Sequence, residues 1–427
     1  MTIKKQTSCA DDFETDAISV EEAQKRIFAE IDPVKGIEKL TLRNCLNRFL
    51  AEDITSPINV PSHTNSAMDG YAIAAVDLPK DKEQSYQVST TAYAGAPAPE
   101  AYKQGQIIRI MTGAVMPEGT DTVIMQEMVE RNNNTVTIKE GHKKGQNVRY
   151  PGEDINKGSQ ILSAGRQITA ADLGILASLG IGELHVFRKP RIAFFSTGDE
   201  LRSIGDIRGG ALKEGEIYDS NRYTLFGMLK NLQVDIIDMG VIRDTKDAIR
   251  AAFISASEMA DFVITSGGVS VGEADYIKPT LKELGDTHFW KIAMKPGRPL
   301  TFGCLNNNGS KSWFFGLPGN PVAVMVTFLQ FVQPAIRYLA SGNIISPITL
   351  QATCTSKLYK RAGRTEFQRG IFEQTTDGKL QVKRTGQQGS GILTSMSIAN
   401  CFIHLPMEST GVSEGETIEI IPFTGAI

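Results

Sequence analysis

The chain has 427 residues, which is too long for one ordinary domain and predicts two to four. Hydrophobic residues make up 41% and charged residues 22%, which is typical of a soluble globular protein. The 45 basic and 48 acidic residues leave a net charge of −3, which argues against bulk nucleic-acid binding. No uninterrupted apolar run approaches the roughly 18 residues of a membrane span, and residues 1–16 lack the apolar core of a secretory signal. We therefore expect a cytoplasmic protein with a disordered lead-in over residues 1–16.

The cysteines and histidines are scattered, and no C-x-x-C motif exists. This spacing argues against a zinc site, and the odd cysteine count with the expected compartment favours free thiols. Any metal would have to be held by carboxylate oxygens, which indicates Mg²⁺.

Two helical segments flank a stretch of short strands in the first half of the chain. Ser19 and Glu22 form a capping box for a helix that reaches about Glu30, and Thr169 begins a second helix that Gly180 ends. Residues 57–149 contain short alternating runs between turn signals, including a hairpin over residues 128–139. We expect residues 17–56 and 150–186 to form one helical linker domain, with residues 57–149 inserted as a small β-domain.

Strands and helices alternate over residues 187–340, which predicts a parallel sheet covered by helices on both faces. After residue 341 the apolar period falls to two, with a hairpin turn at Asp377-Gly378, which predicts a C-terminal β-domain over residues 341–427. The expected fold is therefore α/β and multidomain, with a central doubly wound α/β domain.

Glycines and acids follow several strands of the predicted sheet, and the carboxyl ends of parallel strands meet at one edge, where ligands bind. These turns contain Gly198 to Glu200, Asp244, Gly267-Gly268 with Asp275, and residues 316–321. Each could be an ordinary turn, and Asp244 and Asp275 also occupy good helix N-cap positions. Four such turns on one edge favour a binding site with a hard cation.

Basic residues also occur in this part of the chain. If residues 288–294 form a strand that continues to Lys295, Lys291 and Lys295 share a face, and the Pro296–Pro299 turn adds Arg298. Asn320 can cap the helix that Pro321 begins, whose N-terminus attracts anions. A solvated strand edge is the alternative to this anion clamp, just as an ordinary turn is the alternative for Asp69-Gly70.

Seven motifs occur in a defined order: residues 65–71 (NSAMDGY), 109–114 (RIMTGA), 152–154 (GED), 196–201 (STGDEL), 265–276 (TSGGVSVGEADY), 295–299 (KPGRP) and 316–321 (GLPGNP). Together they resemble the molybdopterin molybdenumtransferase family, which includes MoeA and the gephyrin E domain, over about residues 17–423.

The resemblance implies a homodimer with a molybdopterin-binding α/β domain and a C-terminal β-barrel-like domain. It implies that adenylylated molybdopterin and molybdate are converted, with Mg²⁺, to molybdenum cofactor and AMP. The implied catalytic residues are Asp69, Thr112, Asp154, Glu200, Asp275, Lys291 and Lys295, and Asp244 and Asp275 would hold Mg²⁺. The implied substrate-binding residues are Ser266, Gly267, Gly268, Pro318, Gly319, Asn320, Pro321, Arg298, Arg369 and Ser390.

Two positions depart from the family pattern: Arg298 stands where many relatives have lysine, and Pro151 precedes Gly152. Two other functions stay open. One is the adenylyltransferase that makes the pterin adenylate, although that family tends to carry Gly-Gly-Thr-Gly where this chain has Gly-Gly-Val-Ser at residues 267–270. The other is a non-catalytic scaffold, as the gephyrin relationship suggests. The retained acids and lysines favour catalysis.

Overall fold

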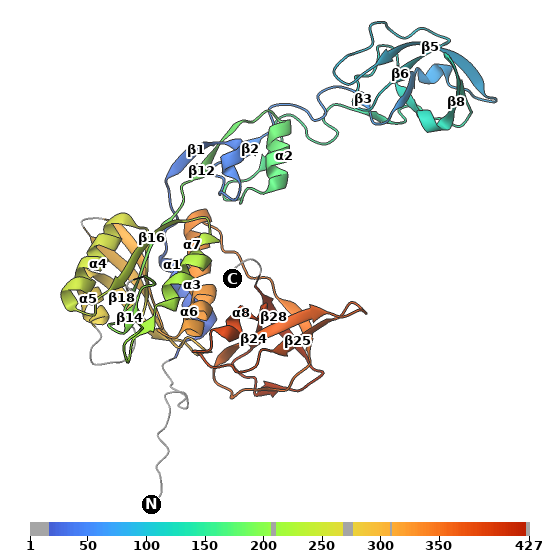
Figure 1. Cartoon of the computed structure of the whole chain (residues 1–427). Helices are drawn as coiled ribbons and strands as arrows, with labels where there is room; N and C mark the ends of the chain where they lie inside the picture. Colours follow the sequence, from blue (N-terminus) through green and yellow to red (C-terminus); the bar gives the residue numbers. More distant parts are fainter. Residues whose placement is uncertain (1–16, 206–210, 268–275, 308–309, 424–427) are drawn as a thin grey trace, which may run out of the picture. The chain divides into compact units, whose positions relative to one another are not determined.

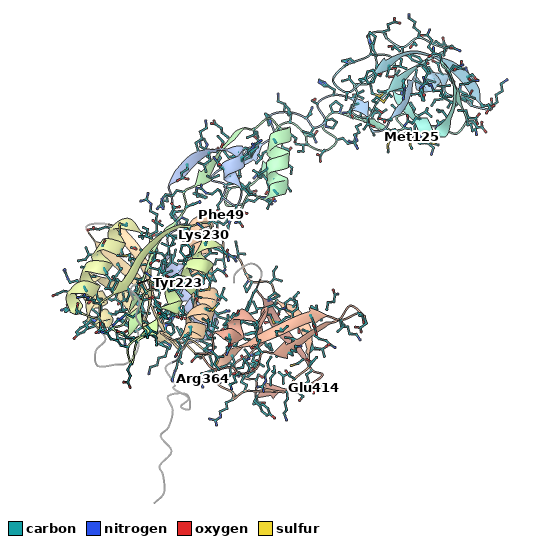
Figure 2. The ribbon with its side chains drawn as sticks, viewed as in Figure 1. Phe49, Met125, Tyr223, Lys230, Arg364 and Glu414 are labelled. Carbon is teal, nitrogen blue, oxygen red and sulfur yellow. The ribbon has the colours of Figure 1, made fainter. Side chains whose placement is uncertain are left out.

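The computed structural model describes residues 17–205, 211–267, 276–307 and 310–423 (Figure 1). They form two compact units. The first contains the chain up to Glu38, Asn47–Phe49 and the chain from Phe187 onward, and the second contains Lys39–Leu46 and Leu50–Val186. Figure 2 shows the described side chains. The predicted lead-in and the predicted site residues Gly268 and Asp275 lie outside the described residues.

A six-stranded sheet forms the centre of the first unit. Its strand order is β16 (Asp235–Ile242), β13 (Arg191–Thr197), β17 (Phe262–Ser266), β21 (Ser310–Leu317), β20 (Pro299–Asn307) and β18 (Gly285–Lys291). The first four strands are parallel, as predicted. The expectation of an entirely parallel sheet is wrong, because β20 and β18 run antiparallel. The chain between β18, β20 and β21 is too short for the helical crossover that parallel neighbours require.

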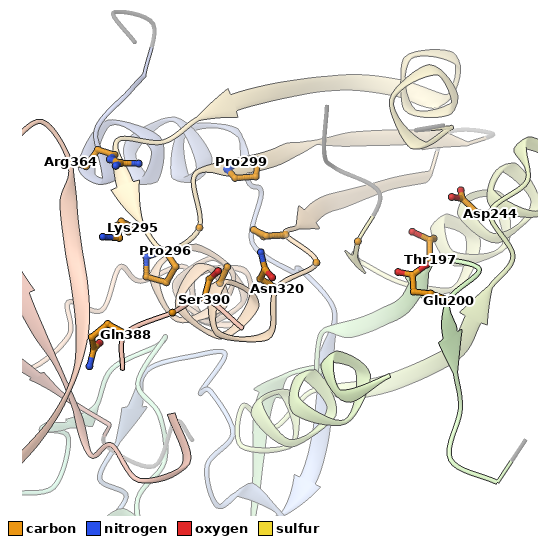
Figure 3. A pocket seen from close by; sticks show the side chains of 17 residues that line it. Thr197, Glu200, Asp244, Lys295, Pro296, Pro299, Asn320, Arg364, Gln388 and Ser390 are labelled. Carbon is orange, nitrogen blue, oxygen red and sulfur yellow. The ribbon is translucent and has the colours of Figure 1, made fainter. Parts of the chain in front are cut away.

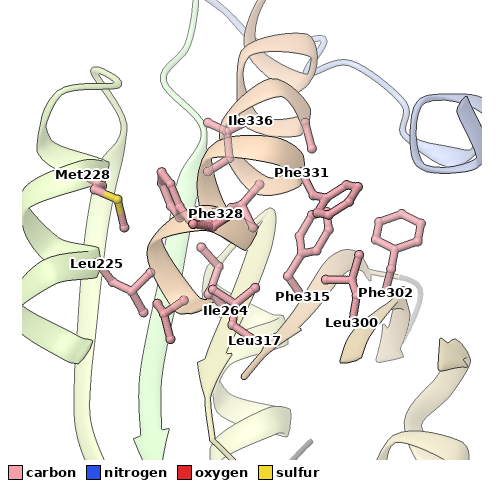
Figure 4. Packing of buried hydrophobic residues seen from close by; sticks show 14 of the residues in the cluster. Leu225, Met228, Ile264, Leu300, Phe302, Phe315, Leu317, Phe328, Phe331 and Ile336 are labelled. Carbon is pink, nitrogen blue, oxygen red and sulfur yellow. The ribbon is translucent and has the colours of Figure 1, made fainter. Parts of the chain in front are cut away.

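Helices cover both faces of this sheet, and side chains alternate along β13 accordingly. Ile192 and Phe194 join the apolar cluster that includes α3 (Ser220–Lys230), whereas Ala193 and Phe195 join the cluster of α4 (Lys246–Met259) and α5 (Ile277–Leu284). Figure 4 shows part of the first cluster, where Leu225 and Met228 of α3 lie opposite Phe328 and Ile336. The two clusters confirm the doubly wound arrangement.

One continuous helical stretch fills the centre of the larger cluster. It consists of α6 (Pro321–Thr327), a π-helical turn η4 (Phe328–Val332) and α7 (Gln333–Ser341). By length and composition alone this stretch could span a membrane, although Gln330 and Gln333 interrupt its apolar run. Most of it is buried inside the first unit, and this burial explains its apolar character.

The first helix, α1 (Val20–Glu30), belongs to the same core. Ser19 caps it by accepting a hydrogen bond from the Glu22 backbone N–H (3.1 Å), which confirms the predicted N-cap. The predicted return bond from the Glu22 side chain is not formed, and Glu22 Oε1 instead accepts from Arg26 Nε (2.7 Å). Its apolar stripe is buried in the larger cluster, and Gln24 donates to the Gln330 carbonyl (2.8 Å). The assignment of this helix to the linker domain is therefore wrong, because its apolar face packs on the α/β core. The other domain boundaries stay a prediction.

The C-terminal part of the first unit is a closed five-stranded barrel. Its strands are β22 (Leu350–Cys354), β24 (Thr365–Gln374), β25 (Leu380–Arg384), β26 (Cys401–Leu405) and β28 (Thr417–Pro422). The ring closes because β24 pairs with both β25 and β26. The predicted hairpin is confirmed, with Gly378 at φ 85° in its turn. A short strand from the α/β part, β19 (Met294–Lys295), pairs with β24 in parallel.

The second unit contains a six-stranded sheet and a helical part. The sheet order is β7 (Thr122–Met125), β4 (Gly70–Ile73), β6 (Gln106–Ile110), β5 (Gln84–Ala92), β9 (Thr135–Ile138) and β8 (Val129–Asn132). The predicted β8–β9 hairpin is confirmed. The capping box of Thr169 with Asp172 begins α2 (Ala170–Ser178), and Gly180 follows it at φ 74°. Cys45 and Leu50 share an apolar cluster with Leu176, so the segments flanking the sheet meet.

Candidate functional site

A cavity of about 550 Å³ lies at the carboxyl edge of the parallel strands (Figure 3). Thr197 ends β13, Asp244 follows β16, Gly267 follows β17, and Pro318 follows β21, and all four line the cavity. For the described residues of these turns, the prediction that they meet at one edge is confirmed. The volume lies in the range that holds small organic ligands.

The two sides of the cavity differ in charge. Glu200 and Asp244 lie on one side, and Lys295 and Arg364 lie on the other, with Ser390 from the barrel between them (Figure 3). A ligand that spans the cavity would therefore meet carboxylates at one end and cations at the other. Such a division suits an anionic ligand that also binds a metal ion.

Asp244 is crowded by like charge. Burial raises its pKa, and the nearby carboxylates of Asp199 and Glu200 raise this pKa further. Its backbone N–H donates to Asp199 Oδ1 (3.3 Å). The cap of α4 is Thr245, whose hydroxyl accepts from the Ala248 N–H (3.3 Å), so the N-cap alternative for Asp244 is wrong. The Asp244 side chain is therefore not used by the helix.

The predicted magnesium site is described only in part. Asp275, its second predicted ligand, lies outside the described residues. Among the residues that the structure describes, no group of three or more His, Cys, Asp or Glu side chains is placed to hold a metal ion. One or two carboxylates can suffice for Mg²⁺ when phosphates and waters complete its shell. Repulsion among Asp199, Glu200 and Asp244 makes this side of the cavity favourable for a cation.

Gly267 allows two strand ends to approach closely. It has φ 89°, and a Cβ atom there would lie 2.8 Å from the Thr197 carbonyl oxygen. Ser266, a predicted binding residue, is buried instead and its hydroxyl accepts from Asn221 Nδ2 (2.9 Å). The same Nδ2 donates to the Gly319 carbonyl (2.7 Å), so Asn221 ties together two of the turns that line the cavity. No local sequence pattern predicts this contact.

The N-terminus of α6 is tied to the barrel. Asn320 occupies the N-cap position, but its side chain makes no capping hydrogen bond, so that part of the prediction is wrong. The Val322 N–H donates to the Ser390 carbonyl (3.0 Å). One of the N–H groups expected to attract an anion is therefore already used, and this bond holds Ser390 at the cavity. Pro321 occupies the first turn without lining the cavity.

The two lysines of the predicted anion clamp separate. Lys291 ends β18, whereas Lys295 lies in β19, which pairs with the barrel strand β24. The expectation that they share a face of one strand is wrong, because the chain leaves the sheet at Ile292, which bridges to Ile18. Lys295 lines the cavity; Lys291 and Arg298 are not among its lining residues.

Arg369 is buried behind the cavity and does not line it. Its guanidinium donates to the Gly389 carbonyl (3.1 Å) and to Ser395 Oγ (3.1 Å), and its backbone N–H donates to Gln388 Oε1 (2.8 Å). Arg369 therefore supports the loop whose members Gln388, Gly389 and Ser390 do line the cavity. Its assignment as a direct binding residue is not supported by this geometry, because only 1% of its surface is exposed.

Of the predicted residues, the structure brings eight to the cavity: Glu200, Asp244, Gly267, Lys295, Pro318, Gly319, Asn320 and Ser390. The prediction did not assign the other lining residues to the site: Thr197, Gly198, Pro296, Gly297, Pro299, Ala323, Arg364, Gln388 and Gly389. Most are direct neighbours of predicted residues. Arg364 is a distant cation that sequence spacing alone could not connect to the site. The roles of all these residues stay predictions.

Three predicted catalytic residues lie in the second unit. Asp69 Oδ1 accepts hydrogen bonds from the Thr112 backbone N–H (2.7 Å) and from Thr112 Oγ1 (2.7 Å). These bonds, the backbone bond first, lower the pKa of Asp69, although burial opposes them. Asp154 lies in a separate turn, where its N–H donates to the Val60 carbonyl (3.0 Å). Thr112, which is also a predicted catalytic residue, thus stabilises the carboxylate form of Asp69.

The fold and the cavity define a multidomain α/β protein with a cavity at the carboxyl edge of its parallel strands that has carboxylates on one side and cations on the other. Residues 18–180 match the MoeA N-terminal region (domain I and II), residues 193–338 match a probable molybdopterin binding domain, and residues 351–423 match the MoeA C-terminal region (domain IV). The chain belongs to the MoeA family of molybdopterin molybdenumtransferases.

Relatives match over nearly their whole length. The molybdopterin molybdenumtransferase of Haemophilus influenzae is 44% identical over 95% of this chain and 98% of its own length, and that of Bacillus subtilis is 33% identical over 95% and 94%. Gephyrin of Dictyostelium discoideum is 33% identical, with 94% of this chain matching 62% of that protein. A crystal structure of the molybdopterin biosynthesis moeA protein from Pyrococcus horikoshii OT3 superposes with a TM-score of 0.82 at 29% identity, covering 95% of this chain and 100% of that one.

Proposed function

We propose that this protein inserts molybdenum into adenylylated molybdopterin and releases AMP in a magnesium-dependent reaction, which yields molybdenum cofactor. The observation that carries the proposal is that one cavity has carboxylates on one side and cations on the other. Family membership and the names of its near full-length relatives support the transferase activity.

The cationic side suits the charge of both substrates. Molybdate is a dianion, and the pterin adenylate carries further phosphates. Lys295 and Arg364 can offset that charge, and the Gly319 turn lets a ligand approach the backbone closely. The barrel loop at Ser390 adds polar groups beside them. These residues would bind and orient the phosphates.

The acidic side fits a magnesium ion. Asp244, with Asp275 as its predicted partner, would hold the ion, and bound Mg²⁺ would polarise the phosphoanhydride as a Lewis acid. The raised pKa of Asp244 supports this assignment, because a bound cation would relieve the repulsion from Asp199 and Glu200. The chain's own contribution is to hold carboxylates together at the position where the metal binds.

The proposal includes a homodimer in a cytoplasmic setting. Asp69, Thr112 and Asp154 would then complete the active site from a second copy of the chain, as the family resemblance implies. The hydrogen-bonded Asp69 and Thr112 provide a preformed polar group for that purpose. If a second copy completes the active site, activity should be lost when dilution separates the dimer into monomers. A monomer that stays active would contradict this part of the proposal.

The test supplies adenylylated molybdopterin, Mg²⁺ and molybdate to the purified protein and follows AMP release. We expect AMP release that depends on both ions, and a large loss in Lys295→Gln. The matched control is Lys311→Gln, since Lys311 lies near the start of β21, at the opposite edge of the sheet. AMP release at a rate that does not depend on molybdate would contradict metal insertion. Formation of pterin adenylate from molybdopterin and ATP would instead identify an adenylyltransferase.

A further inference from the structure

A buried carboxylate lies directly behind the cavity lysine. Glu366 faces Lys295 in the register of β24 with β19, and its Oε1 is 3.2 Å from Lys295 Nζ. The Glu366 side chain is 8% exposed, whereas the Lys295 side chain is 52% exposed. The ammonium group therefore lies at the cavity wall while its counter-ion is inside the protein.

The second carboxylate oxygen is also held. Gln368, two residues along the same strand, donates from Nε2 to Glu366 Oε2 (3.0 Å) and to the Tyr359 carbonyl (3.3 Å). Since residues two apart on a strand point to the same side, this contact follows from the strand geometry. Both oxygens of Glu366 therefore have partners, which fixes the orientation of the carboxylate.

The charge of Glu366 also acts on two buried cations. Burial lowers the pKa of Arg369 to about 10, and the Glu366 charge opposes this shift. Burial likewise lowers the pKa of Lys360, whose Nζ donates to the Met407 and Ser409 carbonyls (3.0 and 2.8 Å), and Glu366 again opposes the shift. Glu366 thus links the cavity lysine to the cations that support the barrel.

We propose that Glu366 is a positioning residue that fixes Lys295 at the wall of the cavity, so that the ammonium group meets the ligand anion in a defined place. A lysine side chain loses rotamer entropy when it is held in one position. An ion pair formed before the ligand arrives removes part of that cost from binding. This inference rests on the proposed function for its kinetic consequence, but the ion pair can be tested without it.

The kinetic test is a double-mutant cycle of Glu366→Gln and Lys295→Gln. Glutamine keeps the shape of Glu366 and removes its charge. We expect a loss of about 10- to 100-fold in kcat/KM for AMP release in Glu366→Gln, the range for a hydrogen bond to a charged group. In the Lys295→Gln background, the same change should cost less than about twofold, because its effect passes through Lys295. Additive losses would overturn the proposal. Glu373→Gln, an exposed acid on the same strand, should match the wild type.

A second measurement does not depend on activity. Acetylation of Lys295 by acetic anhydride is followed by mass spectrometry on the intact full-length protein. We expect several-fold faster acetylation in Glu366→Gln, with Lys311 unchanged as an internal control. Gln368→Met keeps the charge of Glu366 but removes the hydrogen bond to its Oε2. It should therefore accelerate acetylation of Lys295 by a smaller factor, and it replaces Glu366→Gln as the test variant if Glu366→Gln fails to fold. Unchanged acetylation would overturn the proposal. Absence of AMP release by the wild type, with acetylation as expected, would instead contradict the proposed function.

Discussion

The crowding of Asp244 predicts that removing its charge stabilises the protein when no metal is present. In Asp244→Asn the side chain keeps its shape but no longer repels Asp199 and Glu200. Because folding raises the pKa of Asp244, ionisation costs the folded state free energy. This cost is absent well below the ordinary value of 3.8, grows as the pH rises through the raised pKa, and is complete above it.

The expected gain is small, because Asp244 is only partly buried and solvent screens its neighbours. For such groups we expect a gain of about 1 kcal/mol or less in the free energy of unfolding. This corresponds to a rise of roughly 1–3 °C in the midpoint of the transition that contains the α/β core. The gain should be full well above the raised pKa and should shrink as the pH is lowered through it.

The assay is thermal unfolding of both proteins with EDTA and with a Mg²⁺ titration. Mg²⁺ should raise the midpoint of the wild type, because at one hundred times its dissociation constant it adds about 2.7 kcal/mol to the free energy of unfolding. It should have much less effect on Asp244→Asn. Asp247→Asn, in the first turn of the same helix, is the matched control and should be neutral or slightly destabilised. A lower midpoint for Asp244→Asn in EDTA, or equal stabilisation of both proteins by Mg²⁺, would refute the reasoning.

Three further outcomes are expected. Asn221→Ala removes the two hydrogen bonds that tie the Ser266 and Gly319 turns together. It should lower the free energy of unfolding by about 2 kcal/mol and raise KM for the pterin adenylate. Wild-type kinetics in this variant would show that these bonds do not shape the cavity. Thr112→Val keeps the backbone bond to Asp69 but loses the hydroxyl bond, so the Asp69 pKa, followed by carboxyl NMR, should rise part of the way toward its ordinary value, and an unchanged pKa would contradict the described contact. If a second copy completes the active site, mixing the inactive Asp69→Asn and Lys295→Gln proteins should restore up to about a quarter of the wild-type activity, because half of the randomly exchanged dimers are mixed and each has one intact site of two. No recovery after verified subunit exchange would place both residues of one active site in the same copy.

Much of the fold follows from local sequence signals. The caps at Ser19 and Thr169, the stop at Gly180 and the hairpin turn at Gly378 depend on hydrogen bonds and backbone angles within a few residues. The alternation of strands and helices also placed Asp244 and Gly267 at one edge of the sheet, because parallel strands must end on the same side. Local chemistry and topology therefore located the cavity.

The sequence itself determined the order of the elements, their local ends and the edge of the sheet that carries the site. Tertiary structure decided which cations reach that site: Lys295 leaves the sheet to pair with β24, Arg369 is buried, and Arg364 comes from the barrel to line the cavity. The Lys295–Glu366 pair joins residues 71 positions apart, so no local pattern encodes it. Helix and strand periods report which face of an element is apolar, whereas the partner of a charged side chain depends on how distant segments pack.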